Sequence, residues 1–123
     1  MKRVFIKMKL LMHILKNNPR LKINNETITF NEIKDKLKEE FYEVVKAINN
    51  YNNERSLVNL KEVIRETFDI IQIAILILWK CHRIAKFLDK PNLIQDINLE
   101  HKDKLILERG WIPETGIKID VKE

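Results

Sequence analysis

The sequence predicts an all-α protein. The chain has only two Gly and three Pro in 123 residues, too few for a sandwich or barrel, whose turns recur about every 8–12 residues. Apolar residues recur at steps of three and four along most of the sequence, as on one face of a helix. Hydrophobic residues make up 45% and charged residues 33%, so we expect one folded domain over residues 1–123.

The first predicted helix covers residues 3–17. Its apolar residues fall at helical spacing, and Pro19 follows as a stop signal. Residues 20–30 mix β-branched residues with an Asn-Asn pair, which favours a loop, with a short extended segment as the alternative. The apolar positions of this first helix are Val4, Phe5, Met8, Leu11, Met12 and Leu15.

A second helix is predicted over residues 31–50. Seven apolar residues between Phe30 and Ile48 fall within about 120° of one another on a helical projection. A cluster of Asn residues around Tyr51 then predicts a polar break, because Asn side chains compete for nearby backbone groups. Ser56 is placed to cap the N-terminus of the next helix.

The third predicted helix covers residues 57–88, with no Gly or Pro inside it and Pro91 beyond its end. From Ile70 to Trp79 it is apolar on every side, which is typical of a helix covered all round. A domain of this size offers few neighbours to cover it, so we expect oligomerisation through this helix. The apolar run is about half the length needed to span a bilayer, and we expect no membrane contact.

A last helix is predicted over residues 92–108. Gly110 follows it and can supply the left-handed conformation that often ends a helix. The remaining residues, 110–123, are predicted to form an extended tail, which includes the alternating Ile117, Ile119 and Val121.

Charge and cysteine content limit the cellular compartments and the binding partners to be expected. The net charge is +5, but 18 acidic residues are interleaved with 23 basic ones, so nucleic acid is not the expected partner, and a triphosphate would be attracted equally well. The single Cys81 cannot form an internal disulfide, which favours a reducing, cytoplasmic setting. Lys7, Lys9 and His13 interrupt the continuous apolar run of a signal peptide.

Acidic residues on the second and third helices form the candidate site. Glu40 and Glu43, and likewise Glu66 and Asp69, are three residues apart, so each pair leaves its helix on one side. Two such pairs facing each other would make a cage of four carboxylates, which suits magnesium or manganese.

The position of each acid relative to the apolar stripe distinguishes candidate metal ligands from a candidate base. Glu40 borders the stripe, Glu43 is next, and Glu39 is furthest out, so Glu39 is the candidate for an outer group or a base that activates water. Glu62 lies within about 40° of Glu66 and can add a fifth acid to the same face. Alternatively, these acids are ordinary solvated side chains that pair with lysines. Against this, Asp69 lies where the helix turns fully apolar, and burying an acid there without a cation is costly.

The two acidic motifs resemble the signature E-E-x-x-E followed by E-x-x-D of the MazG-like family, within the all-α nucleoside triphosphate pyrophosphohydrolases. In this sequence they read Glu39-Glu40-Phe41-Tyr42-Glu43 and Glu66-Thr67-Phe68-Asp69, with 22 residues between them. The helices concerned, over about residues 3–88, make up about two thirds of the chain.

The resemblance implies a four-helix unit that forms a homodimer or homotetramer. It also implies hydrolysis of a nucleoside triphosphate between the α and β phosphates, with basic groups after the third helix near the phosphates. It implies magnesium held by Glu40, Glu43, Glu66 and Asp69, and the available basic groups are Lys102, Lys104 and Arg109.

Two other functions remain open from the sequence. A protein with the same acidic cage and no activity would sense or sequester nucleotides. A basic helical protein with an apolar run would bind nucleic acid or another helix, and its acidic residues would then tolerate substitution.

Overall fold

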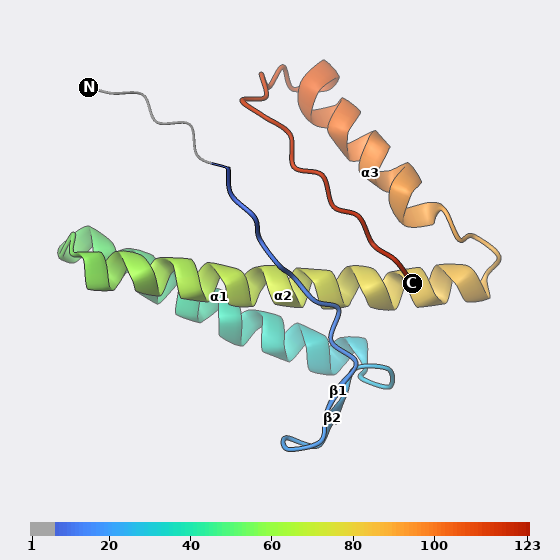
Figure 1. Ribbon diagram of the computed structural model, residues 1–123, viewed down its shortest axis with the longest axis horizontal. Coiled ribbons are helices and arrows are strands. Elements are labelled where there is room, and N and C mark those ends of the chain that lie inside the picture. Colours follow the sequence, from blue (N-terminus) through green and yellow to red (C-terminus); the bar gives the residue numbers. More distant parts are fainter. Residues whose placement is uncertain (1–6) are drawn as a thin grey trace. The chain divides into compact units, whose positions relative to one another are not determined.

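The computed structural model describes residues 7–123 and is mostly helical, as the sequence predicts (Figure 1). The chain divides into two compact units, one ending at Lys80 and the other running from Cys81 to Glu123, and each is described by itself. The elements in chain order are β1 (Asn17–Asn18), β2 (Ile23–Asn24), α1 (Phe30–Asn53), α2 (Leu57–Phe87), α3 (Leu93–Asp103) and a π-helix, η1 (Lys104–Glu108).

The prediction of a helix over residues 3–17 is wrong for the part that the structure describes. Residues 7–16 have no regular secondary structure, and residues 3–6 lie outside the described range. Met8 is 74% exposed and Leu11 is 83% exposed. A helix of this length is marginal without a surface for its apolar face, and here these two side chains are mostly exposed.

A short hairpin replaces the loop expected before the second helix. β1 and β2 pair antiparallel, with Asn18 opposite Ile23. The side-chain oxygen of Asn18 accepts hydrogen bonds from the backbone N–H groups of Arg20 and Leu21, both at 3.1 Å, and Lys22 takes a positive φ of 55°. The extended alternative is therefore the observed one, held by an Asn side chain that mimics backbone.

A capping box begins α1. The Thr29 hydroxyl accepts a hydrogen bond from the Glu32 backbone N–H at 3.1 Å, and the Glu32 carboxylate accepts one from the Thr29 N–H at 3.3 Å. The helix continues to Asn53, through the Asn cluster expected to break it. The Asn59 side-chain amide donates to the carbonyl oxygens of Asn50 and Glu54, at 3.3 and 2.8 Å, and so stabilises this longer end.

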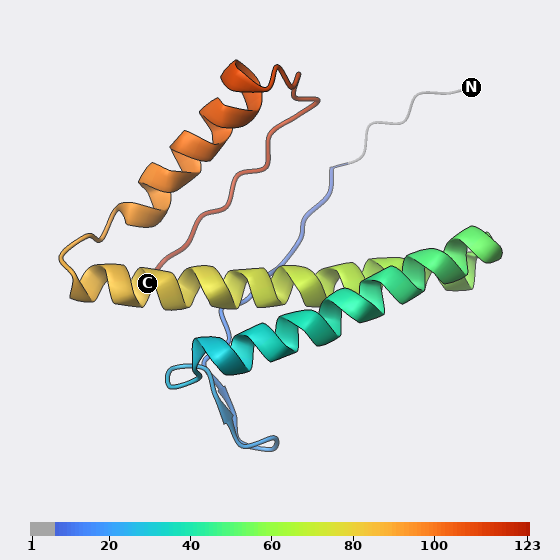
Figure 2. The same ribbon diagram turned by 180° about the vertical axis from the view of Figure 1, so that it is seen from behind.

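α2 follows the bounds predicted from the sequence closely. Its first turn is capped by Ser56, whose hydroxyl accepts from the Asn59 backbone N–H at 3.2 Å. Because the connection from Asn53 to Leu57 is short, α1 and the part of α2 up to Lys80 run antiparallel and side by side (Figures 1 and 2).

A small apolar cluster holds this helical pair together. Ile33 of α1 and Ile73 of α2 are 2% and 5% exposed and pack with Ile28, and Leu76 and Ile77 lie against them. The single chain does not cover the apolar run of α2 all round, because Leu78 remains 53% exposed. That a second copy covers it stays a prediction.

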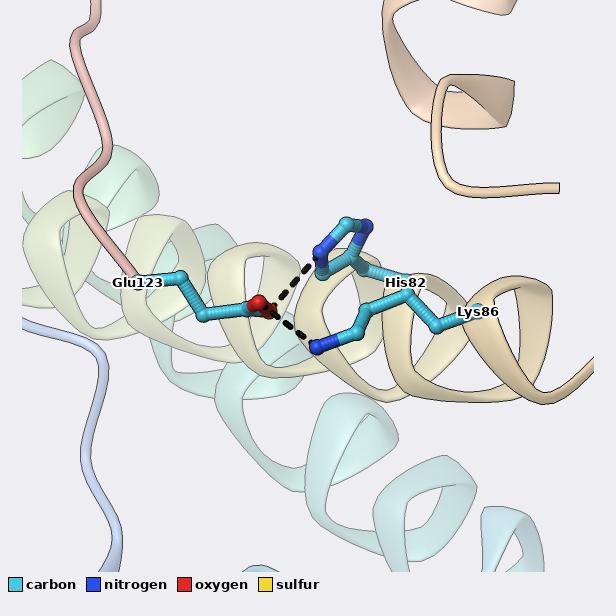
Figure 3. A network of polar contacts seen from close by, with 3 residues as sticks. All are labelled: His82, Lys86 and Glu123. Carbon is cyan, nitrogen blue, oxygen red and sulfur yellow. Dashed lines mark hydrogen bonds and ion pairs between the residues drawn. The ribbon is translucent and has the colours of Figure 1, made fainter. Parts of the chain in front are cut away.

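The second unit contains the end of α2, α3, η1 and the tail. Gly110 has a φ of 71°, as predicted for the residue after the last helix, and the tail beyond it has no regular secondary structure. The Glu123 carboxylate accepts hydrogen bonds from Lys86 Nζ at 2.6 Å and from His82 Nε2 at 3.0 Å (Figure 3). The bond from Lys86 is the largest cause that lowers the pKa of Glu123.

Within residues 7–123, no helix combines the length and hydrophobicity needed to cross a bilayer.

Candidate metal centre

Three carboxylates from two helices come together in the first unit. Glu40 of α1 and Glu66 and Asp69 of α2 each offer an oxygen, and these three oxygens all lie within 4.8 Å of one another. The antiparallel pairing of α1 with α2 brings the two acidic motifs to the same level. Three of the four predicted metal ligands therefore converge.

The acids of α1 differ in burial in the order that the helical angles predict. Glu40 and Glu43 are half-buried, whereas Glu39 is exposed. Burial is the largest cause that raises the pKa of Glu40, and the negative charges of Asp69, Glu39 and Glu43 act in the same direction. Lys36, one turn earlier on α1, opposes this rise. Glu43 is not one of the three converging groups, although its charge acts on Glu40 from the same helix.

On α2, a pair of carboxyl groups extends the cluster. A side-chain hydrogen bond with Glu62 is the largest cause that raises the pKa of Glu66 to about 7, and burial and the charges of Asp69, Glu62 and Glu43 add to it. Glu62 also accepts a hydrogen bond from Arg65 Nη1 at 3.1 Å. The sequence therefore correctly places Glu62 on the Glu66 face.

Asp69 differs from the sequence-based expectation. It is exposed, so the cost of burying its charge does not arise in the single chain. Repulsion among the carboxylates also raises the pKa values of Glu40 and Glu66, but it ranks behind burial for Glu40 and behind the hydrogen bond with Glu62 for Glu66.

The donor set fits a hard divalent cation. All three groups are carboxylates, which are the ligands that magnesium and manganese prefer. Oxygens around a six-coordinate magnesium ion lie about 3 to 4 Å apart, as follows from metal–oxygen distances of about 2.1 Å. The observed limit of 4.8 Å is somewhat wider than this range, so the three groups would have to move closer together around an ion. A cation would also neutralise the repulsion among the acids.

The predicted phosphate-binding residues lie in the second unit. Lys102 is in α3, where its ammonium group is 3.7 Å from the Asp103 carboxylate, and it lines an open, apolar depression of about 450 Å³ beside Trp111. Lys104 begins η1, and its carbonyl oxygen accepts a hydrogen bond from the Arg109 N–H at 3.0 Å. A phosphate-binding role for these three residues stays a prediction.

Sequence reasoning missed two basic residues beside the acids. Lys36 acts on Glu40, and Arg65 binds Glu62. Both could have been found from spacing, since Lys36 is four residues before Glu40 and Arg65 is three residues after Glu62, the separations at which helical side chains meet.

Comparisons with known proteins add no family assignment. No protein-family model matches the chain, and neither the curated proteins nor the solved structures gave a significant match. The resemblance to the MazG-like family therefore rests on the two acidic motifs, and it stays a prediction.

Proposed function

We propose that this protein is a magnesium-dependent nucleoside triphosphate pyrophosphohydrolase of the MazG-like type, which releases a nucleoside monophosphate and pyrophosphate. The observation that carries the proposal is the convergence of Glu40, Glu66 and Asp69, whose oxygens lie within 4.8 Å of one another. Supporting it, these residues belong to two motifs whose spacing resembles that of the MazG-like enzymes.

In the proposed reaction, a water oxygen attacks the α phosphorus, and the bond to the oxygen that bridges the α and β phosphates breaks. A bound divalent cation, magnesium or manganese, would neutralise phosphate oxygens and lower the pKa of a bound water. Glu40, Glu66 and Asp69 would hold it, with Glu43 as a fourth ligand after a change of rotamer. Glu39 is exposed beside Glu40, where it can orient the water and accept its proton.

Basic groups are needed to bind the triphosphate. We assign this role to Lys102, Lys104 and Arg109, which lie close together in the sequence on α3, η1 and the residue after η1. A cytoplasmic setting belongs to the same proposal, since nucleoside triphosphates are abundant there and Cys81 is a free thiol.

We also propose that the chain forms a homodimer or homotetramer, in which helices of neighbouring copies complete a four-helix unit. The support is the apolar surface that the single chain leaves uncovered on α1 and α2. Phe41 is 63% exposed, Ile64 48% and Leu78 53%, whereas side chains of this size are mostly buried in folded proteins. Light scattering at micromolar concentration tests this, and a monomeric mass would contradict it.

The test of activity is a panel of ribo- and deoxynucleoside triphosphates with and without magnesium, with nucleoside monophosphate and pyrophosphate measured by chromatography. We expect metal-dependent release of both products, lost in Asp69→Asn and retained in Asp35→Asn, which removes an exposed carboxylate elsewhere on α1. Metal-dependent nucleotide binding without turnover would instead indicate a nucleotide-binding protein. Absence of both would overturn the proposal.

A further inference from the structure

The N-terminal part of the chain carries a one-sided charge. Among residues 1–25 there are seven basic residues and no Asp or Glu, while the rest of the chain has 16 basic and 18 acidic residues. The positive net charge of the protein therefore comes from this segment. The seven residues are Lys2, Arg3, Lys7, Lys9, Lys16, Arg20 and Lys22.

The same segment exposes large apolar side chains. Between residues 7 and 16, Met8 is 74% exposed, Leu10 61%, Leu11 83% and Leu15 51%. The chain is extended here, and three of its backbone oxygens accept hydrogen bonds from other parts of the first unit. The carbonyl of Lys16 accepts from the Asn25 backbone N–H at 2.9 Å. The carbonyl of His13 accepts from the Gln72 side-chain amide at 2.7 Å, and that of Leu15 accepts from the Asn25 amide at 3.1 Å.

A helix would sort these residues onto two faces. At about 100° per residue, Met8, Leu11 and Leu15 fall within about 60° of one another, and Lys9 and Lys16 lie roughly opposite Leu11 and within about 20° of each other, whereas Lys7 falls about 40° from Leu11. The segment thus has the pattern of an amphipathic helix with Lys9 and Lys16 on its polar face, while the structure leaves it extended and most of its apolar side chains exposed. A helix of this kind forms when its apolar face meets a matching surface.

We propose that residues 7–16 bind an anionic lipid surface and become helical there. The apolar face would enter the boundary between headgroups and acyl chains, and Lys9 and Lys16 would contact acidic headgroups. Lys16 is 3.7 Å from the Glu26 carboxylate, but both groups are exposed, and such pairs are weak enough to exchange for a lipid phosphate. The segment lies on the surface, so the finding that no described helix spans a bilayer does not bear on it.

Charge complementarity favours lipid over nucleic acid. A nucleic-acid backbone would attract the same lysines, but it offers no counterpart to four exposed apolar side chains on one segment. A lipid surface matches both features at once. The cytoplasmic leaflet of a membrane is negatively charged, so this binding agrees with the cytoplasmic setting proposed above. The proposal replaces the expectation of no membrane contact.

The test is sedimentation of the full chain with phosphatidylcholine vesicles and with vesicles that also contain roughly 30% phosphatidylglycerol. We expect at least about tenfold tighter binding to the anionic vesicles, a fall in binding at about 0.5 M salt, and a rise in helical circular dichroism on binding. The double variant Lys9→Glu/Lys16→Glu should lose about tenfold or more, and Leu11→Glu should lose a similar amount.

Matched controls make the test specific. Lys118→Glu/Lys122→Glu changes the net charge equally in the exposed tail, and Ile117→Glu changes a side chain that is 89% exposed; both should bind vesicles as the wild type does. Asp69→Asn, which disables the proposed metal centre, should also bind them. The proposal would be overturned by equal binding to both vesicle types, or by tail variants that lose as much vesicle binding as the variants of residues 7–16. Preference for duplex DNA over anionic vesicles would also overturn it.

Discussion

The carboxyl group of Glu66 is hydrogen-bonded to that of Glu62, one turn earlier on α2, and this contact raises the pKa of Glu66 to about 7. A hydrogen bond between two carboxyl groups needs one proton, so the metal-free cluster holds a proton close to neutral pH. Glu66 is also one of the three groups whose oxygens converge. Proton binding and metal binding therefore compete at the same side chain.

Metal affinity should consequently depend on pH. Because a metal ion needs the ionised form of Glu66, we expect the affinity for manganese to rise steeply between about pH 6 and pH 8, around the pKa of about 7. Isothermal titration at pH values across this range measures it. An affinity that stays constant from pH 6 to pH 8 would contradict a role for Glu66 as a ligand.

The stability of the metal-free protein should show the opposite dependence. The pKa of Glu66 is raised from 4.5 to about 7 on folding, so between these values the folded state binds the extra proton. The unfolding free energy contributed by this group is therefore greatest below about pH 4.5 and is lost as the pH rises towards 7. Urea denaturation should find Glu66→Gln becoming more stable relative to the wild type over this interval. Glu100→Gln, an exposed change on α3, should give no such trend.

The capping box at the start of α1 gives a local stability prediction. Thr29→Ala removes the hydroxyl that accepts the Glu32 N–H, and we expect a loss of about 1 kcal/mol in the free energy of unfolding. Thr115→Ala, in the exposed tail, should change it by less than about 0.5 kcal/mol. Equal effects of the two substitutions in urea denaturation would argue against the cap.

Truncation of the apolar cluster should be more costly. Ile33 is only 2% exposed and packs with Ile28 and Ile73, so Ile33→Ala should lower the free energy of unfolding by about 2–5 kcal/mol. Ile112→Ala removes the same atoms from a side chain that is 91% exposed and serves as the control. If both variants unfolded at the same denaturant concentration, the packing of α1 on α2 would not be the main source of stability.

The sequence predicts the long helices well and the N-terminal segment badly, for one physical reason. α1 and α2 combine strong periodicity with capping residues and with each other's apolar faces, so local and tertiary preferences agree. Residues 7–16 have the periodicity alone, and without a surface to cover Met8 and Leu11 that pattern does not produce a helix.

For the candidate site, helical spacing in the sequence was sufficient to predict that Glu40, Glu66 and Asp69 come together from two facing helices. Spacing could not predict that Asp69 is exposed, because its burial depends on what covers α2. It also could not predict that the pKa of Glu66 is raised to about 7, because that depends on the rotamers that join Glu62 to Glu66. The exposure of Asp69 and the pKa of Glu66 depend on where side chains lie in three dimensions, which helical spacing in the sequence does not specify.

We propose that Glu40, Glu66 and Asp69 bind a divalent cation, and titration of the purified protein with manganese at about pH 8 tests this most directly. We predict saturable binding that is weakened at least about tenfold in Asp69→Asn and unchanged in Asp35→Asn. No saturable binding at millimolar manganese, or equal binding by all three proteins, would contradict the account.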